Sequence, residues 1–161
     1  MKPPLDAELR SFVGYRLKRA MNVFSSDLAI TLRPFDLRMI TFSTLSSVVS
    51  NPGIRQSQLA ETLAVERPNL VSIVDELANR DLIERKRDDA DRRAFGLFAT
   101  EAGTALFQDA TRAVMQHETQ ILSALSEQDV ETLTALLARI EQAKKGSPMA
   151  YPPHTILTTT T

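Results

Sequence analysis

Arg67, Asn69 and Ser72 are grouped at the start of a segment, Arg67–Arg80, whose apolar residues recur at helical spacing. Arginine can donate two hydrogen bonds to guanine, asparagine can pair with adenine, and serine can contact a base or a phosphate. These residue types at the start of a helix are therefore suited to reading nucleic-acid bases. A solvated helix face is the competing interpretation.

A second group of charged residues lies between two short apolar stretches. Leu82–Arg87 and Ala94–Phe98 are each predicted to form a strand, and the polar segment Asp88–Arg93 is predicted to join them as a hairpin. The aspartates of this tip could bind a cation weakly, but the interleaved arginines argue against a metal site. A hairpin whose charges merely compensate one another in solvent is the alternative.

The elements around these groups form a helix-turn-helix pattern. A short helix is predicted over Gln56–Leu63, a tight link at Ala64–Val65, and a second helix over Arg67–Arg80. In the second helix the buried stripe is predicted to consist of four apolar residues: Leu70, Val71, Val74 and Leu77. Ile73 is assigned to the outward face, together with the polar residues.

Four further helices are predicted. The first spans Leu5–Leu28, and a second begins at Pro34, which suits the first turn of a helix, and stops at the turn Asn51–Gly53. Thr100 is predicted to cap a long helix that follows the hairpin. Ser126–Asp129 resembles a capping box that opens the last one.

The composition favours one compact, mainly helical architecture. The chain has 161 residues, of which 43% are hydrophobic, with 5 glycines and no cysteine. An all-β fold is excluded, as are disulfides and thiol chemistry. No stretch is apolar enough for a signal peptide or a membrane span, so we expect a cytoplasmic protein.

The net charge of −1 does not by itself indicate a nucleic-acid binder. Residues 1–40 carry seven Lys and Arg against four Asp and Glu, whereas residues 94–161 carry four against seven. Neither end is basic enough to argue for a polyanion partner. The argument must rest on where individual arginines lie.

The sequence gives little reason to expect an enzyme. His117 lies on the apolar face of a predicted helix with no nearby serine or second histidine, so it is expected to be an interior or pocket residue. No glycine-rich phosphate loop is found. We therefore predict no catalytic residues, no cofactor and no metal.

The segment Leu32–Phe107 resembles the MarR family of winged-helix transcription regulators. The matching stretches are Ile54–Leu63, Arg67–Ser72, Asp75–Leu77, Leu82–Arg85, Asp91–Ala94 and Thr100–Gly103. Two features depart from the family pattern. Asp81 replaces the usual glycine after the second helix, and Glu66 and Arg67 replace the usual Ser or Asp cap.

The resemblance implies a role for each charged residue of the hairpin. Asp91 is expected to orient Arg93, which enters the minor groove, where negative potential is concentrated. The remaining arginines, Arg85, Arg87 and Arg92, become candidates for phosphate contacts. The fold is then mainly α with a small β-hairpin wing, dimerised through the N- and C-terminal helices.

We expect four regions: an N-terminal dimerisation helix (1–33), a winged helix-turn-helix (34–100), C-terminal dimerisation helices (101–145) and a flexible tail (146–161). The predicted dimer interface consists of Leu5, Leu9, Leu133, Leu136, Leu137 and Ile140. Packing of these residues within one chain is the alternative. A two-fold dimer would bind a pseudo-palindromic operator in double-stranded DNA.

The resemblance also implies a small aromatic or anionic effector, bound between the dimerisation helices and the winged unit. Phe12, Arg16, Met39 and Phe42 are the candidate ligand-binding residues, although core packing explains the three apolar ones equally well. The predicted function is a ligand-released repressor. The alternative is a winged-helix protein-interaction module that has lost DNA binding.

Overall fold

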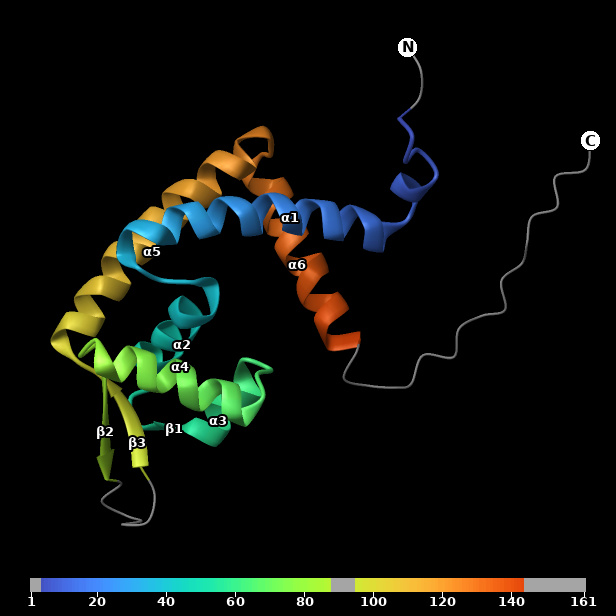
Figure 1. The fold of residues 1–161 in the computed structure, drawn as a ribbon. Helices are drawn as coiled ribbons and strands as arrows, with labels where there is room; N and C mark the ends of the chain where they lie inside the picture. Colours follow the sequence, from blue (N-terminus) through green and yellow to red (C-terminus); the bar gives the residue numbers. More distant parts are fainter. Residues whose placement is uncertain (1–3, 88–94, 144–161) are drawn as a thin grey trace, which may run out of the picture. The chain divides into compact units, whose positions relative to one another are not determined.

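The computed structural model describes residues 4–87 and 95–143, and the chain divides into two units at Ile121. The first unit holds most of the elements (Figure 1). In chain order they are η1 (Leu9–Ser11), α1 (Val13–Leu32), η2 (Arg33–Phe35), α2 (Met39–Ser50), β1 (Ile54–Arg55), α3 (Gln56–Thr62), α4 (Arg67–Asn79), β2 (Ile83–Arg87), β3 (Phe95–Ala99) and α5 (Glu101–Ile121).

Helices α3 and α4 form the predicted helix-turn-helix, with a turn at residues 63–66. The predicted buried stripe of α4 is wrong at one position. Ile73 is buried, whereas Val71 is 44% exposed, so the two residues exchange the places expected for them. The buried set Leu70, Ile73, Val74 and Leu77 forms a stripe rotated by less than one residue step from the predicted one, because packing partners rather than periodicity decide where its centre lies.

The sheet has three strands in the order β1-β3-β2, all antiparallel. The hairpin of β2 and β3 was predicted, but β1 was not, because it is two residues long and exists only through its pairing with β3. Gly96 on β3 pairs with Arg55 and lies close to Gly53, since a side chain at Gly96 would lie 2.9 Å from the Gly53 backbone. The two glycines therefore allow the turn before β1 to approach β3 closely.

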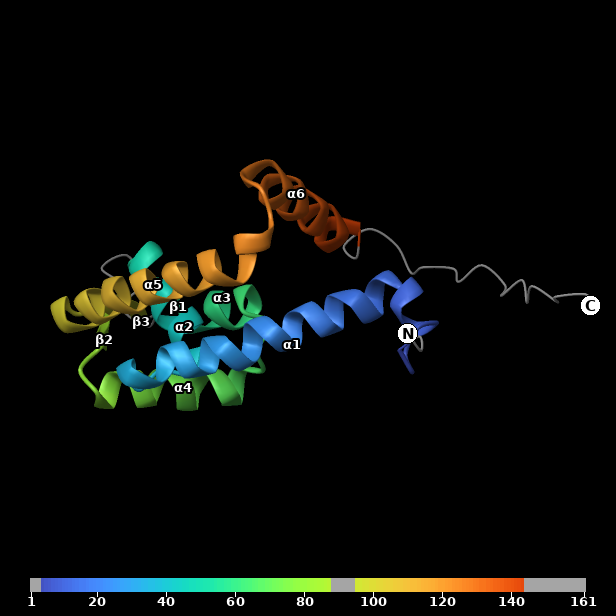
Figure 2. The same cartoon turned by 90° about the horizontal axis from the view of Figure 1, so that it is seen from above.

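The N-terminal helix differs from its predicted bounds. A separate 3-10 turn, η1, precedes α1, which begins at Val13 and continues to Leu32, beyond the predicted end at Leu28. Phe12 adopts an extended conformation and separates the two elements. In the first unit α1 packs along α5 (Figure 2).

Pro34 does not start the central helix, contrary to our expectation. It lies in the short helix η2, which ends where Asp36 takes a left-handed conformation with φ 51°. Arg38 is extended and its backbone N–H donates to Thr41 Oγ1 at 2.8 Å, so α2 begins at Met39. The side-chain cap at Thr41, rather than the proline, marks the start of this helix.

The junction from α4 through β2 to α5 confirms two local expectations. Asp81 takes the left-handed conformation that the family pattern assigns to glycine, with φ 56°. Thr100 caps α5, since its hydroxyl accepts from the Gly103 N–H at 2.9 Å and donates to the Asp81 carbonyl at 2.6 Å. A side chain at Gly103 would collide with the Leu82 carbonyl, so glycine is required for this close contact.

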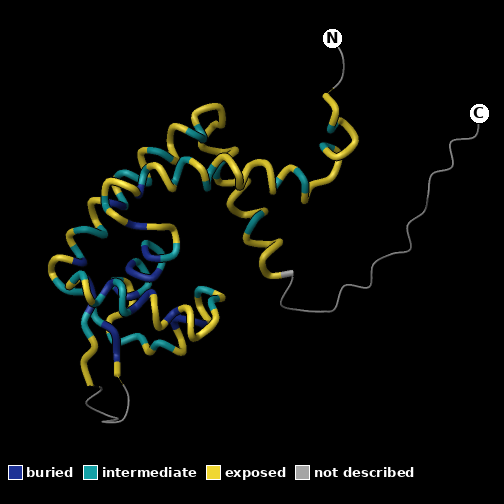
Figure 3. The backbone as a smooth tube through the Cα atoms, in the orientation of Figure 1, coloured by how far each residue is buried: buried dark blue, intermediate teal, exposed yellow. Residues whose placement is uncertain are grey.

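The core of the first unit lies beneath the helix-turn-helix. Figure 3 shows that buried backbone is concentrated in the segments from α2 to β3, whereas the first half of α1 is largely exposed. The fully buried side chains with the largest volumes come from five different elements: Leu32, Leu45, Leu59, Leu70, Leu77 and Leu97. They anchor α4 by one face and leave its other face outward.

The second unit contains η3 (Leu122–Ala124) and α6 (Glu127–Ala143). The predicted capping box is confirmed: the Ser126 N–H and hydroxyl donate to Asp129 Oδ2, and the Asp129 N–H donates back to Ser126 Oγ at 3.2 Å. These bonds from Ser126 lower the pKa of Asp129. The apolar residues Leu133, Leu136 and Ile140 of α6 are exposed.

Candidate nucleic-acid interface

The first turns of α4 present polar side chains on its outward face. Arg67, Asn69 and Ser72 are all exposed, while Leu70 and Val74 between and behind them are buried. All three residues predicted to contact bases therefore lie at the accessible N-terminal end of the second helix of the helix-turn-helix. This is the end from which side chains of such a helix reach base edges.

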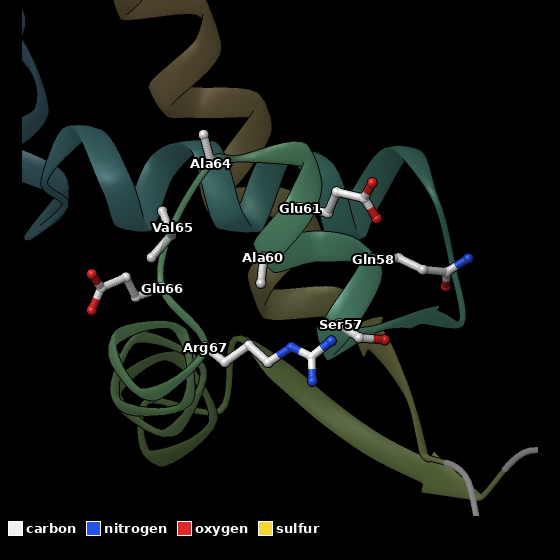
Figure 4. A pocket seen from close by; sticks show the side chains of 8 residues that line it. All are labelled: Ser57, Gln58, Ala60, Glu61, Ala64, Val65, Glu66 and Arg67. Atoms are coloured by element: carbon white, nitrogen blue, oxygen red, sulfur yellow. The ribbon is translucent and has the colours of Figure 1, made fainter.

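A hollow of about 650 Å³ separates the start of α4 from α3. Figure 4 shows the Arg67 side chain extending toward Ser57 on α3, whereas Glu66 points away on the other side of the turn. Exposed polar residues of α3, among them Ser57, Gln58 and Glu61, line the rest of the hollow. Arg67 is thus presented between the two helices rather than folded against the core.

The turn into α4 lacks a conventional side-chain cap. Glu66 occupies the cap position and makes no capping hydrogen bond, as its residue type predicts, while Pro68 stands in the first turn. Ala64 takes a left-handed conformation with φ 52°, which the sequence did not indicate. The tight link is therefore held by backbone bonds, such as that from Val65 N–H to the Ala60 carbonyl at 2.9 Å.

The wing packs beside α4 through an arginine. Arg85 on β2 donates from Nη2 to Asp75 on α4 and forms an ion pair with it. Since alternate residues of a strand share a face, Arg87 lies on the same face of β2 as Arg85, two residues further along the strand. The charge of Arg85 is thus partly neutralised within the chain.

Aromatic rings accompany the other two cations of β2. The Arg87 guanidinium carbon lies 5.9 Å from the centre of the Phe95 ring, and Lys86 Nζ lies 5.3 Å from the centre of the Phe98 ring. Lys86 is also paired with Glu84 at 2.6 Å.

Two arginines hold α4 against the segment that joins α1 to α2. Arg38 forms an ion pair with Glu76 in the middle of α4. From the end of α4, Arg80 donates to the carbonyl oxygens of Asp36 at 2.6 Å and Phe35 at 3.1 Å. These contacts join α4 to a second neighbouring segment besides the wing, and the sequence pattern did not predict them.

Three of the predicted DNA contacts belong to residues that the structure does not describe. Asp91, Arg92 and Arg93, which the sequence places at the tip of the hairpin, lie outside the described residues, as does the predicted tail 146–161. Their proposed roles stay predictions.

The predicted ligand set divides into two pairs. Phe12 is 63% exposed and Arg16 donates from Nε to the Arg10 carbonyl, both at the start of α1. Met39 is 45% exposed on α2, and the Phe42 ring packs 5.8 Å from that of Phe107. The rise of α1 separates the start of the helix from the end that leads to α2 by about 30 Å. Within one chain, Phe12 and Arg16 therefore lie at the opposite end of α1 from Met39 and Phe42.

His117 faces a small cavity between α1 and α5. Its Nε2 lies 3.6 Å from Asp27 Oδ2, and the cavity of about 310 Å³ is completed by Val23, Gln120 and Ile121. The side chain is mostly covered. This placement agrees with the expected pocket residue.

Known proteins share both the sequence and the fold. The MarR family model matches residues 35–94. A transcriptional repressor, CouR, solved bound to a 23-mer DNA duplex, is 33% identical over 87% of this chain and 99% of its own, with a TM-score of 0.81. The chain belongs to the MarR family. The resemblance found in the sequence and the predicted winged-helix fold are thereby confirmed.

Other MarR-family structures match over similar lengths. CouR from Rhodococcus jostii RHA1 bound to p-coumaroyl-CoA is 25% identical over 89% of this chain and 98% of its own, with a TM-score of 0.74. Wild-type MarR from E. coli in its apo form is 23% identical over 80% of this chain and 96% of its own, with a TM-score of 0.70, and shows the fold alone. None of the described helices is long and apolar enough to cross a membrane.

Some residues of the interface were missed by the sequence analysis. Val71 was assigned to the buried stripe, yet it is exposed on α4 four residues after Arg67. Ser57 and Gln58 were predicted only to be part of the first helix of the helix-turn-helix, although they line the hollow beside Arg67. A signal for the α3 pair existed in the helix-turn-helix pattern, which brings the two helices together; none existed for Val71.

Proposed function

We propose that this MarR-family protein is a sequence-specific, DNA-binding transcription repressor that a small ligand releases from its operator. The observation that carries this proposal is the exposure of Arg67, Asn69 and Ser72 at the start of α4, whose opposite face is buried in the core. Such a helix can enter the major groove with its N-terminal side chains at the base edges. The similarity to CouR bound to DNA supports the same function.

The wing supplies contacts beside the major groove. Arg87 on β2, together with Arg92 and Arg93 further along the hairpin, would contact phosphates and the minor groove. Arg85 would contact a phosphate only if its ion pair with Asp75 were broken. We assign the sequence-independent part of the affinity to this region, since contacts to phosphates carry no base information.

The functional unit that we propose is a homodimer. Leu5 and Leu9 near the N-terminus and Leu133, Leu136 and Ile140 in α6 are exposed in the single chain, and Leu137 is half-buried. Burial of such residues against a second copy would remove apolar surface from water. Glutamate at Leu136 and Ile140 is expected to yield monomers in sedimentation experiments.

The proposed effector is aromatic or anionic. The CouR structure with p-coumaroyl-CoA, whose ligand is both, supports this class. Phe12 and Arg16 of α1 would meet Met39 and Phe42 across subunits, since one chain separates the pairs. We infer that the dimer has two conformations that differ in the spacing of the two wings. An effector acts only if it binds one of these conformations more tightly than the other. Thermal-shift screening with phenolic acids and their coenzyme A thioesters would identify it.

Selection of bound sequences from a random pool of DNA duplexes tests the function. The wild-type chain should enrich inverted repeats whose half-sites are about 10 bp apart. Asn69→Ala should weaken binding to the enriched site by about 1–3 kcal/mol and relax the preference at one position. Asn79→Ala is the matched control, because Asn79 is an exposed asparagine at the far end of the same helix. Failure to enrich any sequence would favour the interaction-module alternative.

A further inference from the structure

Two cation–ring pairs lie on opposite faces of the β2–β3 hairpin. Arg87 and Phe95 are direct cross-strand partners, and the guanidinium carbon lies 5.9 Å from the ring centre. Lys86, the preceding residue, lies over Phe98 at 5.3 Å. Because neighbouring residues of a strand point to opposite faces, the two pairs offer the same kind of contact on different sides of the wing.

The Arg87 pair is on the side of the hairpin that faces α4. Arg85 shares this face of the strand and forms the ion pair with Asp75 on α4. The Lys86 pair is on the other face, where Glu84 neutralises the ammonium group at 2.6 Å. A DNA duplex that receives α4 therefore meets the Arg87 side of the wing.

The two arginines on this face differ in what holds them. Arg85 gives an N–H donor to a carboxylate, which competes directly with a phosphate. A ring attracts a guanidinium through its π-electrons and takes none of the N–H donors, so these stay available for a phosphate. Of the two, Arg87 is thus the better prepared to bind DNA.

Phe95 has no large role in the core. Its side chain is 49% exposed, and it is absent from the buried cluster that Leu97 joins on the same strand. A half-exposed aromatic ring beside a cation instead limits the conformations of that cation. An arginine that is already ordered loses less freedom when it binds its partner.

We propose that Phe95 is a positioning residue that holds Arg87 in place for a DNA phosphate. This role rests on the proposed DNA-binding function. The strength of an exposed cation–π contact corresponds to an effect of about two- to fivefold on affinity. Phe95→Leu should therefore weaken DNA binding by that factor, and Phe95→Tyr, which keeps the ring, should restore wild-type affinity.

The test measures binding of the full chain to a 30-bp duplex of random sequence by fluorescence anisotropy at several salt concentrations. Arg87→Ala should lower the salt slope by about one, as loss of one phosphate contact requires. In the Arg87→Ala background, Phe95→Leu should have no further effect. Lys86→Ala and Phe98→Leu, on the opposite face of the hairpin, are the matched control pair. The effect of Phe98→Leu on DNA affinity should be the same whether or not Lys86 is present.

Each outcome decides the proposal. Phe95→Val, a second variant suited to a strand, keeps the test valid if Phe95→Leu unfolds. Unchanged affinity in the leucine or valine variant, failure of tyrosine to restore it, or an equal loss in the Arg87→Ala background would overturn the role of Phe95 alone. Absence of binding by the wild-type chain would overturn the DNA-binding function and the role of Phe95 with it.

Discussion

Arg80, the residue that follows α4, donates from Nη1 to the backbone carbonyl of Asp36 at 2.6 Å, 44 residues earlier in the chain. Asp36 is held with φ 51° at the end of η2, so the arginine reaches a carbonyl that the left-handed turn presents. A second bond from Nη2 reaches the Phe35 carbonyl. The segment that follows the proposed dimerisation helix α1 is thereby fastened to the proposed recognition helix.

Removal of this contact should destabilise the winged unit. Arg80→Ala leaves two carbonyl oxygens without a charged donor, so we expect the free energy of unfolding to fall by about 1.5–3 kcal/mol in urea denaturation. Asp36→Asn is the control, because the carboxylate itself is 93% exposed and lies 3.8 Å from Arg80. That variant should change stability by less than about 0.5 kcal/mol. Equal losses in both variants would assign the effect to the surface ion pair.

The left-handed alanine in the turn before α4 should be a site for stabilisation. Ala64 has φ 52°, a conformation that glycine adopts without the steric cost that a Cβ incurs. Ala64→Gly is expected to raise the free energy of unfolding by up to about 1 kcal/mol. Ala105→Gly, at an exposed position inside α5, should lower it by about the same amount. A loss of stability in Ala64→Gly would contradict the strain assigned to this turn.

The N-terminal segment should show an acid-sensitive contact. Hydrogen bonds from Arg10 and Tyr15 lower the pKa of Asp6 from 3.8 to about 2. The contact therefore stabilises this segment above pH 3.8, and the stabilisation is lost as the pH falls through about 2. A carbon-13 titration of the Asp6 carboxyl should have its midpoint near that value, and Tyr15→Phe should raise it. A midpoint near 3.8 in the wild-type chain would show that the contact does not form.

The tip of the wing permits a test in which orientation and simple charge predict opposite results. If Asp91 orients Arg93, Asp91→Ala and Arg93→Ala should each weaken operator binding by about 1–3 kcal/mol. Arg92→Ala, as the loss of a phosphate contact, should weaken operator and random DNA alike. Simple electrostatics instead predicts tighter binding when Asp91 is lost. Improved binding by a folded Asp91→Ala variant would exclude the oriented arginine.

Local chemistry made several elements predictable from the sequence alone. Thr100 and Ser126 were recognised as helix caps because a cap depends on side chains and N–H groups within three residues of each other. Pro68 and the apolar spacing after it located α4 almost to the residue. The polar set at its start followed, since residues at the beginning of a helix and off its apolar stripe are exposed.

Contacts between distant segments were decided only by the tertiary structure. Strand β1 depends on hydrogen bonds to β3, and the choice of Ile73 over Val71 for the core depends on which elements cover α4. The pairing of Arg85 with Asp75 and of Arg80 with Asp36 likewise joins residues whose separation in sequence carries no periodic signal. A pattern in one segment reports that segment's own geometry, whereas burial and ion pairing depend on what the rest of the chain places beside it.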